Sequence, residues 1–244
     1  MKRMITAILM FDLALGLLFL YLTIGRGAEE NKTIASDKVQ VVNGQKDTFL
    51  HSPTEKASFT EKQIALTFDD GPHPRYTEEL LDGLRERGVV VTFFVTGEHA
   101  TLHPDIIERM HTEGHMIGNH TYSHMQLRKN NLDLYKQELL RTSEVIEEIT
   151  GEEVLYVRPP YGSWNKSIEE ELNMFPVLWT VDPLDWCSSN VEAIVNRIVK
   201  NIREGDIILM HDYYATSVDA ALLAVDKLLE QGYRFVTVEE ILFD

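Results

Sequence analysis

Cysteine is almost absent from this chain, since Cys187 is the only one among 244 residues. A single cysteine cannot form an intramolecular disulfide, so the fold must depend on packing or on a bound metal. Hydrophobic residues make up 44% of the chain, which is enough apolar material for one sizeable core. Neither the compartment nor the oligomeric state follows from these counts.

Basic residues are also scarce. Lys and Arg total 23 against 39 Asp and Glu, which gives a formal net charge of −16. Phosphate binding needs a cationic surface, so this balance argues against nucleic acid as a partner. A neutral or cationic partner fits better, although the same charge would also serve plain solubility.

Charge is nearly missing from residues 5–24, ITAILMFDLALGLLFLYLTI, where Asp12 is the one exception. This length is about enough to cross a ~30 Å hydrocarbon core, and Lys2 and Arg3 before it favour a cytoplasmic N-terminus. We therefore expect residues 1–24 to form a cytoplasmic stub and an uncleaved transmembrane signal-anchor, with an extracytoplasmic domain held at the cell membrane. A cleaved signal peptide and a secreted protein are the alternative, although GRGAEE after the segment offers no clear small-x-small cleavage site.

The rest of the chain divides in composition near residue 60. Residues 25–60 are polar without a sustained period and predict a flexible linker. From residue 61 to residue 244, apolar runs of strand length alternate with helical periods, of which 191–202 is the clearest. This alternation predicts an α/β domain with helices outside a sheet of about seven parallel strands. The expected strands are 64–68, 89–95, 116–118, 154–157, 177–181, 206–210 and 234–236.

Polar side chains follow five of these strands at their carboxyl ends. In parallel α/β architectures those ends meet on one face, where function collects. The residues delivered there are acids, imidazoles and one arginine, in the segments DD (69–70), NHTYSH (119–124), RPPYG (158–162), DPLDW (182–186) and HD (211–212). Their convergence is the strongest indication of a catalytic site in the sequence.

His120 and His124 are the candidate metal ligands. Two histidines four residues apart can chelate a divalent ion on one face of a turn, with a carboxylate as the third ligand. The spacing alone is weak evidence, and His99, His103, His111 and His115 are interpreted as solvated residues on or beside a helix at 103–113. Zn²⁺ is the expected ion, and Co²⁺ or Mn²⁺ would suit the same donors.

Asp69 and Asp70 are adjacent, so their side chains should diverge. One carboxylate can then bind the metal while its neighbour faces an attacking water as general base. A turn-forming or helix-capping role is the plain alternative.

The remaining candidates complete the predicted site. His211 stands among apolar neighbours, where an ordinary core histidine is the alternative, but its place at a strand end favours a general acid, which Asp185 would orient. Arg158 would leave a charge near the core unless a carboxylate pairs with it, and Asp69 is the expected partner. Trp186 and Leu209 are interpreted as pocket wall and Asp182 as a turn cap, whereas Asp212 and Cys187 have no predicted role.

With these residues assembled, residues 61–244 closely resemble the polysaccharide deacetylase family, carbohydrate esterase family 4. The motifs TFDDGP, HTYSH, RPPYG, DPLDW and LMH appear in order. The resemblance implies a distorted (β/α) barrel of fewer than eight strands and metal-dependent removal of acetyl groups from N-acetylated sugars. CSSN after Trp186 replaces the basic residues common there, which leaves the choice of glycan open.

The resemblance also implies a role for each motif residue. Asp69 corresponds to the catalytic base, held by Arg158, and the metal ligands would be Asp70, His120 and His124. The backbone N–H of Tyr161 would bind the oxyanion, Asp185 would tune the general acid His211, and Trp186 and Leu209 would line the acetyl pocket. The expected substrate is cell-wall peptidoglycan or a chitin-like chain. The alternatives are an esterase or amidohydrolase that acts on acetylated xylan or a small non-sugar amide, and a non-catalytic glycan-binding module.

Overall fold

Parallel strands form the centre of residues 62–243, the part of the chain that this computed structural model describes. The strand order is β5-β4-β3-β2-β1-β6, and β7 also pairs with β1. The strands are β1 (Lys62–Asp69), β2 (Thr92–Val95), β3 (Met116–Asn119), β4 (Tyr156–Val157), β5 (Phe175–Pro176), β6 (Ile207–His211) and β7 (Tyr233–Val236). The predicted signal-anchor and linker lie outside the described residues, and within 62–243 no helix is long and apolar enough to cross a membrane.

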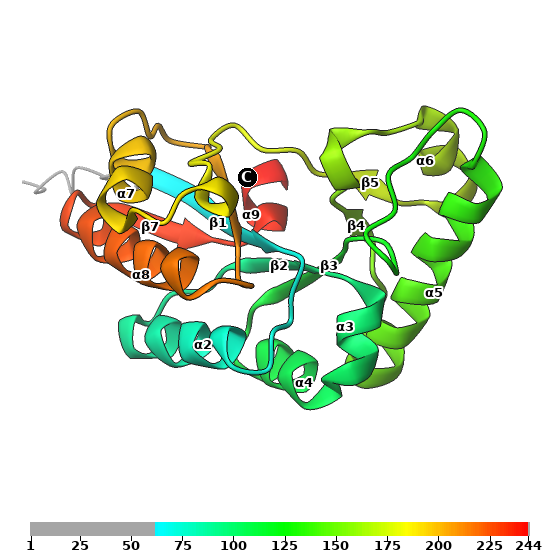
Figure 1. The fold of residues 1–244 in the computed structure, drawn as a ribbon, viewed down its shortest axis with the longest axis horizontal. Helices are drawn as coiled ribbons and strands as arrows, with labels where there is room; N and C mark the ends of the chain where they lie inside the picture. Colours follow the sequence, from blue (N-terminus) through cyan, green and yellow to red (C-terminus); the bar gives the residue numbers. More distant parts are fainter. Residues whose placement is uncertain (1–61, 244) are drawn as a thin grey trace, which may run out of the picture. The chain divides into compact units, whose positions relative to one another are not determined.

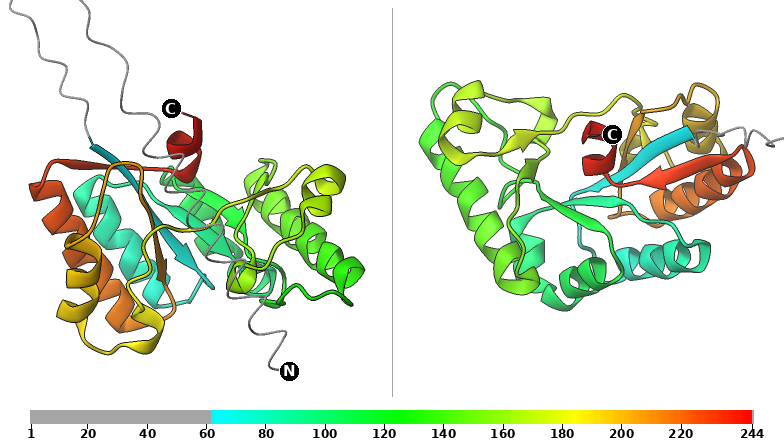
Figure 2. Two further views of the ribbon diagram at one scale, coloured as in Figure 1. Left: turned by 90° about the horizontal axis from the view of Figure 1, so that it is seen from above. Right: turned by 180° about the vertical axis from the view of Figure 1, so that it is seen from behind.

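Helices α2, α4, α5, α7 and α8 lie around the outer side of the curved sheet, whereas α9 lies on its inner side (Figures 1 and 2). Val238 of α9 packs there with Ala65 and Phe94. The helices are α2 (Tyr76–Arg87), α3 (Gly97–Leu102), α4 (Pro104–Thr112), α5 (Leu132–Thr150), α6 (Lys166–Leu172), α7 (Val191–Val199), α8 (Ala215–Glu230) and α9 (Val238–Phe243), with 3₁₀ turns η1 (Pro160–Gly162) and η2 (Asp185–Cys187).

The sheet is a parallel half-barrel, so the predicted α/β class and parallel pairing are confirmed. The prediction of a strand at 177–181 is wrong. Val177 donates its N–H to the carbonyl of Val157, the last residue of β4, whereas Val181 forms a single bridge with Ile208 of β6. This segment therefore crosses between the two outer strands of the sheet, and its backbone bonds change partner before a regular ladder can form.

Successive residues of strand β1 face opposite sides of the sheet. Ile64, Leu66 and Phe68 are fully buried in the main core with the outer helices, and each contributes about 1.5–3 kcal/mol by leaving water. The alternate residues face inward, so Thr67 and Asp69 both meet the guanidinium of Arg158. The period of two thus places one carboxylate inside the half-barrel at the end of a buried strand.

Candidate active site

The strand register brings the predicted acid and base together. In the pairing of β1 with β6, Asp69 is the direct partner of His211, although 142 positions separate them in sequence. On the other side, His120 follows the last residue of β3 and Arg158 follows the last residue of β4. The expected convergence of strand ends on one face is present in the structure.

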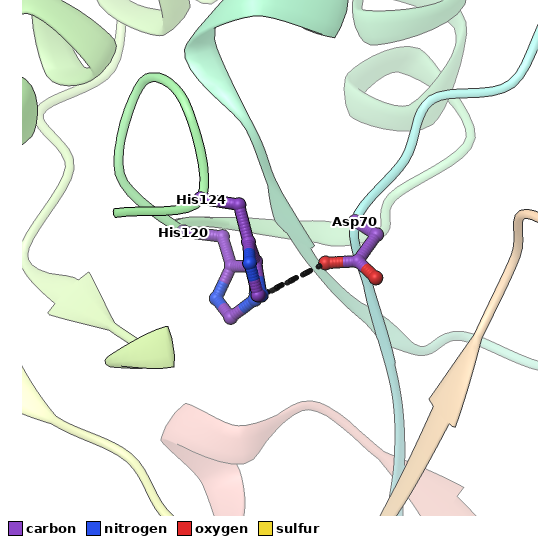
Figure 3. A group of neighbouring side chains, drawn as sticks. All are labelled: Asp70, His120 and His124. Carbon is purple, nitrogen blue, oxygen red and sulfur yellow. Dashed lines mark ion pairs between the residues drawn. The ribbon is translucent and has the colours of Figure 1, made fainter. Parts of the chain in front are cut away.

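Asp70, His120 and His124 form a candidate metal site (Figure 3). The Nε2 atoms of both histidines lie 3.4 Å from Oδ1 of Asp70. One ligand atom from each residue lies within 4.8 Å of the other two, which is the spread that a single ion can bridge. Among residues 62–243 this is the one such group of three.

A backbone contact sets the tautomer of His120. Its Nδ1 lies 2.6 Å from the carbonyl oxygen of Arg158, which can only accept a hydrogen bond. Nδ1 therefore carries the proton and Nε2 presents its lone pair toward Asp70, as metal-binding histidines require.

The turn that follows His120 is held by β3 and α5. The side chain of Asn119 accepts from the N–H of Thr121 and donates to the carbonyl of Leu139. Glu138 of α5 accepts from both the N–H and the hydroxyl of Ser123. These bonds stabilise the left-handed backbone of His124 (φ 56°), which brings its ring back beside His120.

These donors fit a divalent cation. Oδ1 of Asp70 is buried and accepts no hydrogen bond, although a buried carboxylate oxygen normally has a partner. Burial raises the pKa of Asp70, but the adjacent His120 and His124 outweigh it and lower this pKa to about 2. Burial and the neighbouring His120 lower the pKa of His124, which favours its neutral, ligating form. The site therefore combines one carboxylate with two imidazoles, a donor set that suits a divalent ion.

Asp69 has a different environment from Asp70. Its Oδ1 accepts a 2.9 Å hydrogen bond from Nη1 of Arg158, and both side chains are almost fully buried. Arg158 also donates to the carbonyl of Val177, and its guanidinium lies 4.3 Å from the ring centre of Phe94. The second oxygen of Asp69 lies 3.8 Å from Nε2 of His120. The predicted Asp69–Arg158 pair is confirmed as a contact, beside the metal site.

His211, with a side chain that is 13% exposed, and the buried Asp185 form a second pair. Asp185 accepts from Nδ1 of His211 at 3.0 Å and from the backbone N–H of His211 at 2.9 Å. Burial alone would lower the pKa of His211, but the hydrogen bond and charge of Asp185 raise it to about 9. The imidazole is therefore protonated near neutral pH and can donate a proton.

A cavity of about 350 Å³ brings these groups to the surface. Arg158 and Asp185 lie behind it, and Asp182 at its rim caps a turn through the N–H of Leu184, as predicted. Tyr161 and Trp186 are more than half exposed. The cavity is lined by Asp69, Asp70, His120, His124, Pro159, Tyr161, Trp179, Asp182, Trp186, Leu209 and His211.

The sequence analysis missed several residues near the site. Trp179 lines the cavity, and its only sequence signal was its place just before DPLDW. His99 is not simply solvated, because its Nδ1 lies 2.7 Å from the carbonyl of Asp70. His115 is buried, contrary to expectation. Asp212 is buried as well, and burial raises its pKa to about 7 although Thr77 donates to it.

Comparison with known proteins now identifies the family. The family described as polysaccharide deacetylase matches residues 56–177. The chain belongs to this family. It is 41% identical over 181 residues to the peptidoglycan-N-acetylmuramic acid deacetylase PdaC of Bacillus subtilis, covering 74% of this chain and 39% of PdaC. A peptidoglycan-N-acetylglucosamine deacetylase of Bacillus cereus is 40% identical over 190 residues, covering 75% of this chain and 89% of that protein. The chain thus spans less than half of PdaC but most of the second relative.

Solved structures agree with the fold. The structure of PdaC aligns with a TM-score of 0.72, covering 75% of this chain and 90% of that chain. A family 4 acetyl xylan esterase from Clostridium thermocellum, solved with a cobalt ion, aligns with a TM-score of 0.69 at 31% identity, covering 74% of this chain and 90% of that chain. The half-barrel is therefore the fold of this family.

Proposed function

We propose that this protein is a metal-dependent polysaccharide N-deacetylase that acts on cell-wall glycan, with the N-acetylglucosamine of peptidoglycan as the favoured substrate. One observation carries the proposal. A three-residue metal site lies in the same cavity as a buried carboxylate paired with arginine and an imidazole paired with carboxylate. The relatives named as peptidoglycan deacetylases support the choice of polymer.

Asp70, His120 and His124 would hold the ion, for which Zn²⁺ is our proposal and Co²⁺ or Mn²⁺ are the alternatives. A divalent ion bound there supplies a Lewis acid that lowers the pKa of water and polarises the acetyl carbonyl. The protein contributes an open, preformed set of donors, because the backbone contact to Arg158 already orients His120.

The pairs Asp69–Arg158 and His211–Asp185 would carry out the proton transfers. Asp69 takes the proton of the attacking water, and Arg158 holds its carboxylate in place. His211 donates a proton to the departing amine nitrogen, because Asp185 keeps its imidazole protonated. The two groups reach the cavity from neighbouring strands, because Asp69 and His211 are direct partners in the pairing of β1 with β6.

The cavity wall would orient the substrate. Tyr161 has a left-handed backbone (φ 60°), and we assign its N–H to the oxyanion of the tetrahedral intermediate. Trp186 and Leu209 would enclose the acetyl methyl group, with Trp179 beside them.

The composition of the N-terminal residues supports an activity outside the cytoplasm, at the cell membrane. We propose that residues 1–24 anchor the protein in the cell membrane and that residues 25–60 link the anchor to an extracytoplasmic catalytic domain at 61–244. The apolar run of residues 5–24 behind Lys2 and Arg3 is the supporting observation.

Acetate release from glycans tests the proposal. The full chain in detergent is assayed on chitooligosaccharides and peptidoglycan as prepared, after chelation and after Zn²⁺ is restored. We expect release that chelation stops and Zn²⁺ restores. Acetylated xylan and small amides are assayed in parallel, because one structural neighbour is an acetyl xylan esterase. Release from these compounds alone would replace the deacetylase with an esterase or amidohydrolase.

Thermal unfolding tests the metal site independently of activity. Zn²⁺ at 100 times its dissociation constant should stabilise the folded protein by about 2.7 kcal/mol. This stabilisation should disappear in His124→Ala and persist in His103→Ala, a histidine outside the site. Folded protein with bound metal but no acetate release from any substrate would favour a glycan-binding module.

A further inference from the structure

A second hollow adjoins the candidate active site. It measures about 220 Å³ and is lined by Asp70, Thr96, His99, His124, Tyr213 and Tyr214. Asp70 and His124 also line the larger cavity that contains Asp69, Trp186 and His211. Two metal-site residues thus form a wall that both hollows share, whereas Trp186 lines only the larger one.

Aromatic rings build this hollow. Tyr213 stacks on His99 with centroids 5.3 Å apart, and the edge of Tyr213 meets His73 at 4.9 Å. Tyr214 meets Tyr213 at a centroid distance of 6.0 Å and a steep angle of 77°. Such offset and edge contacts stabilise the rings in fixed positions. The cluster is therefore a preformed wall.

This wall contacts the candidate metal site through a hydrogen bond. Nδ1 of His99 donates to the carbonyl of Asp70 at 2.7 Å, which leaves Nε2 of His99 as an acceptor. Tyr213 and Tyr214 directly follow His211 and Asp212 in sequence. A ligand held against these tyrosines is thus positioned relative to both the metal ligand and the proposed acid.

Tyr214 leaves 48% of its surface exposed although it belongs to this ordered cluster. The exposed aromatic residues Tyr161 and Trp186 line the larger cavity and not the second hollow. Exposed aromatic side chains therefore line both the larger cavity and the second hollow. The hollow offers a ring face for stacking, tyrosine hydroxyls and an imidazole nitrogen, which together suit a neutral sugar.

We propose that the second hollow is a subsite for the sugar residue next to the one that is deacetylated, with its pyranose ring against Tyr214. This inference rests on the proposed function. When the acetyl group occupies the larger cavity, a polymeric glycan must continue beyond it. The C–H bonds on the less polar face of a pyranose pack on an aromatic ring, and the sugar hydroxyls meet the polar atoms of the wall.

The dependence of activity on chain length tests this subsite. Acetate release by the full, metal-loaded chain is measured on N-acetylglucosamine, which has no neighbouring sugar to fill the subsite, and on chitotetraose, which has one. In Tyr214→Ala we expect kcat/KM for chitotetraose to fall about fivefold, mainly through KM, so that the advantage of the longer chain shrinks. Tyr214→Phe keeps the ring face and should retain that advantage.

Phe243→Ala is the matched control, because Phe243 is a highly exposed aromatic residue on α9. Helix α9 contacts the first residues of β2 and β4, at the opposite ends of the strands from the site. This variant should leave both substrates unaffected. An unchanged length dependence in Tyr214→Ala would overturn the subsite while acetate release upheld the deacetylase. An effect on peptidoglycan without one on chitotetraose would also overturn it, in favour of a peptide contact.

A binding titration separates failure of the subsite from failure of the proposed function. Chitotetraose is titrated by calorimetry into Asp69→Asn and into the double variant Asp69→Asn/Tyr214→Ala. We expect the second protein to bind about fivefold more weakly. If the unaltered chain releases no acetate from any glycan, the deacetylase assignment fails, and this titration alone decides the subsite. Equal affinity, or no binding to either protein, would overturn it.

Discussion

At the scale of single residues, Asp69 and Asp70 show how adjacent carboxylates acquire different chemistry. Asp69 is the last residue of a buried strand, so its side chain points inward and is 5% exposed. Asp70 has a left-handed backbone (φ 76°) and a side chain 34% exposed. The strand ends between them, so one carboxylate meets arginine and the other meets two imidazoles.

Asp69→Asn should remove activity while it preserves metal binding. Asn still accepts a hydrogen bond from Arg158 through its oxygen, but it cannot take a proton from water. We expect the rate of acetate release to fall by about 10²–10⁴, with Zn²⁺ affinity by calorimetry changed little. Asp105→Asn, an exposed position in the first turn of α4, is the control. Activity within twofold of the unaltered protein would contradict the assignment of the base.

Asp185→Asn should move the alkaline limit of activity. His211 must be protonated to donate, and Asp185 raises the pKa of His211 to about 9. Without that charge, burial is left to lower this pKa, so the alkaline limb of the kcat/KM profile should move to lower pH by more than about one unit. Profiles of both proteins on one chitooligosaccharide measure the displacement. A limb that does not move would show that another group controls it.

At the scale of elements, the short connections carry the site, and the helices hold these connections in position. Arg109 of α4 is a centre of such contacts, because it pairs with Glu78 and Asp82 of α2 and with Glu113. The exposed members of this network contribute little individually. Their joint effect is to hold α2 against α4.

The glycine that ends α2 gives a prediction at this scale. Gly88 has φ 62°, and a Cβ atom there would meet nothing within 4 Å. Gly88→Ala should therefore lower the free energy of unfolding by about 1 kcal/mol through backbone conformation alone. Gly88→Asn should lose less, because Asn adopts the left-handed conformation more readily. Urea denaturation measures both variants, and equal stability of Ala and Gly would contradict the argument.

At the scale of the whole molecule, stability depends on buried groups that the sequence did not distinguish from surface ones. His115 is only 5% exposed, and its Nδ1 accepts the N–H of Val91. Burial lowers the pKa of His115 from 6.5 to about 4. Because the unfolded chain binds a proton that the folded one does not, this residue contributes stability that is present above pH 6.5 and lost as the pH falls toward 4.

His115→Asn removes this titration and keeps a side-chain oxygen near the Nδ1 position. Between pH 4 and pH 7 the unfolding free energy of the original protein, minus that of the variant, should rise by about 3 kcal/mol. The comparison uses the difference between the two proteins because Asp212 also titrates in this range. Burial raises the pKa of Asp212 to about 7, so its contribution to the unfolding free energy falls with pH while that of His115 rises. Urea denaturation at several pH values measures it, and a constant difference would contradict a buried, neutral His115.

Local patterns predicted much of this molecule. Six of the expected strands correspond to β1–β4, β6 and β7. The prediction of a strand at 177–181 failed because this apolar run has the composition of a strand, whereas its two ends bond to different strands. His99 and His115 were misassigned since a histidine beside a helix has the same local sequence whether it is solvated or buried.

The sequence by itself determined most of the strand ends, the ordered motifs and the identities of the candidate metal-site residues, because these depend on periodicity and spacing along the chain. Only the tertiary structure decided that Asp69 lies opposite His211, that His120 presents Nε2 to Asp70, and that Tyr213 stacks on His99. Those contacts depend on strand register and on how helices pack around the half-barrel. Register and packing result from the free energy of the whole core and are not encoded in any single segment.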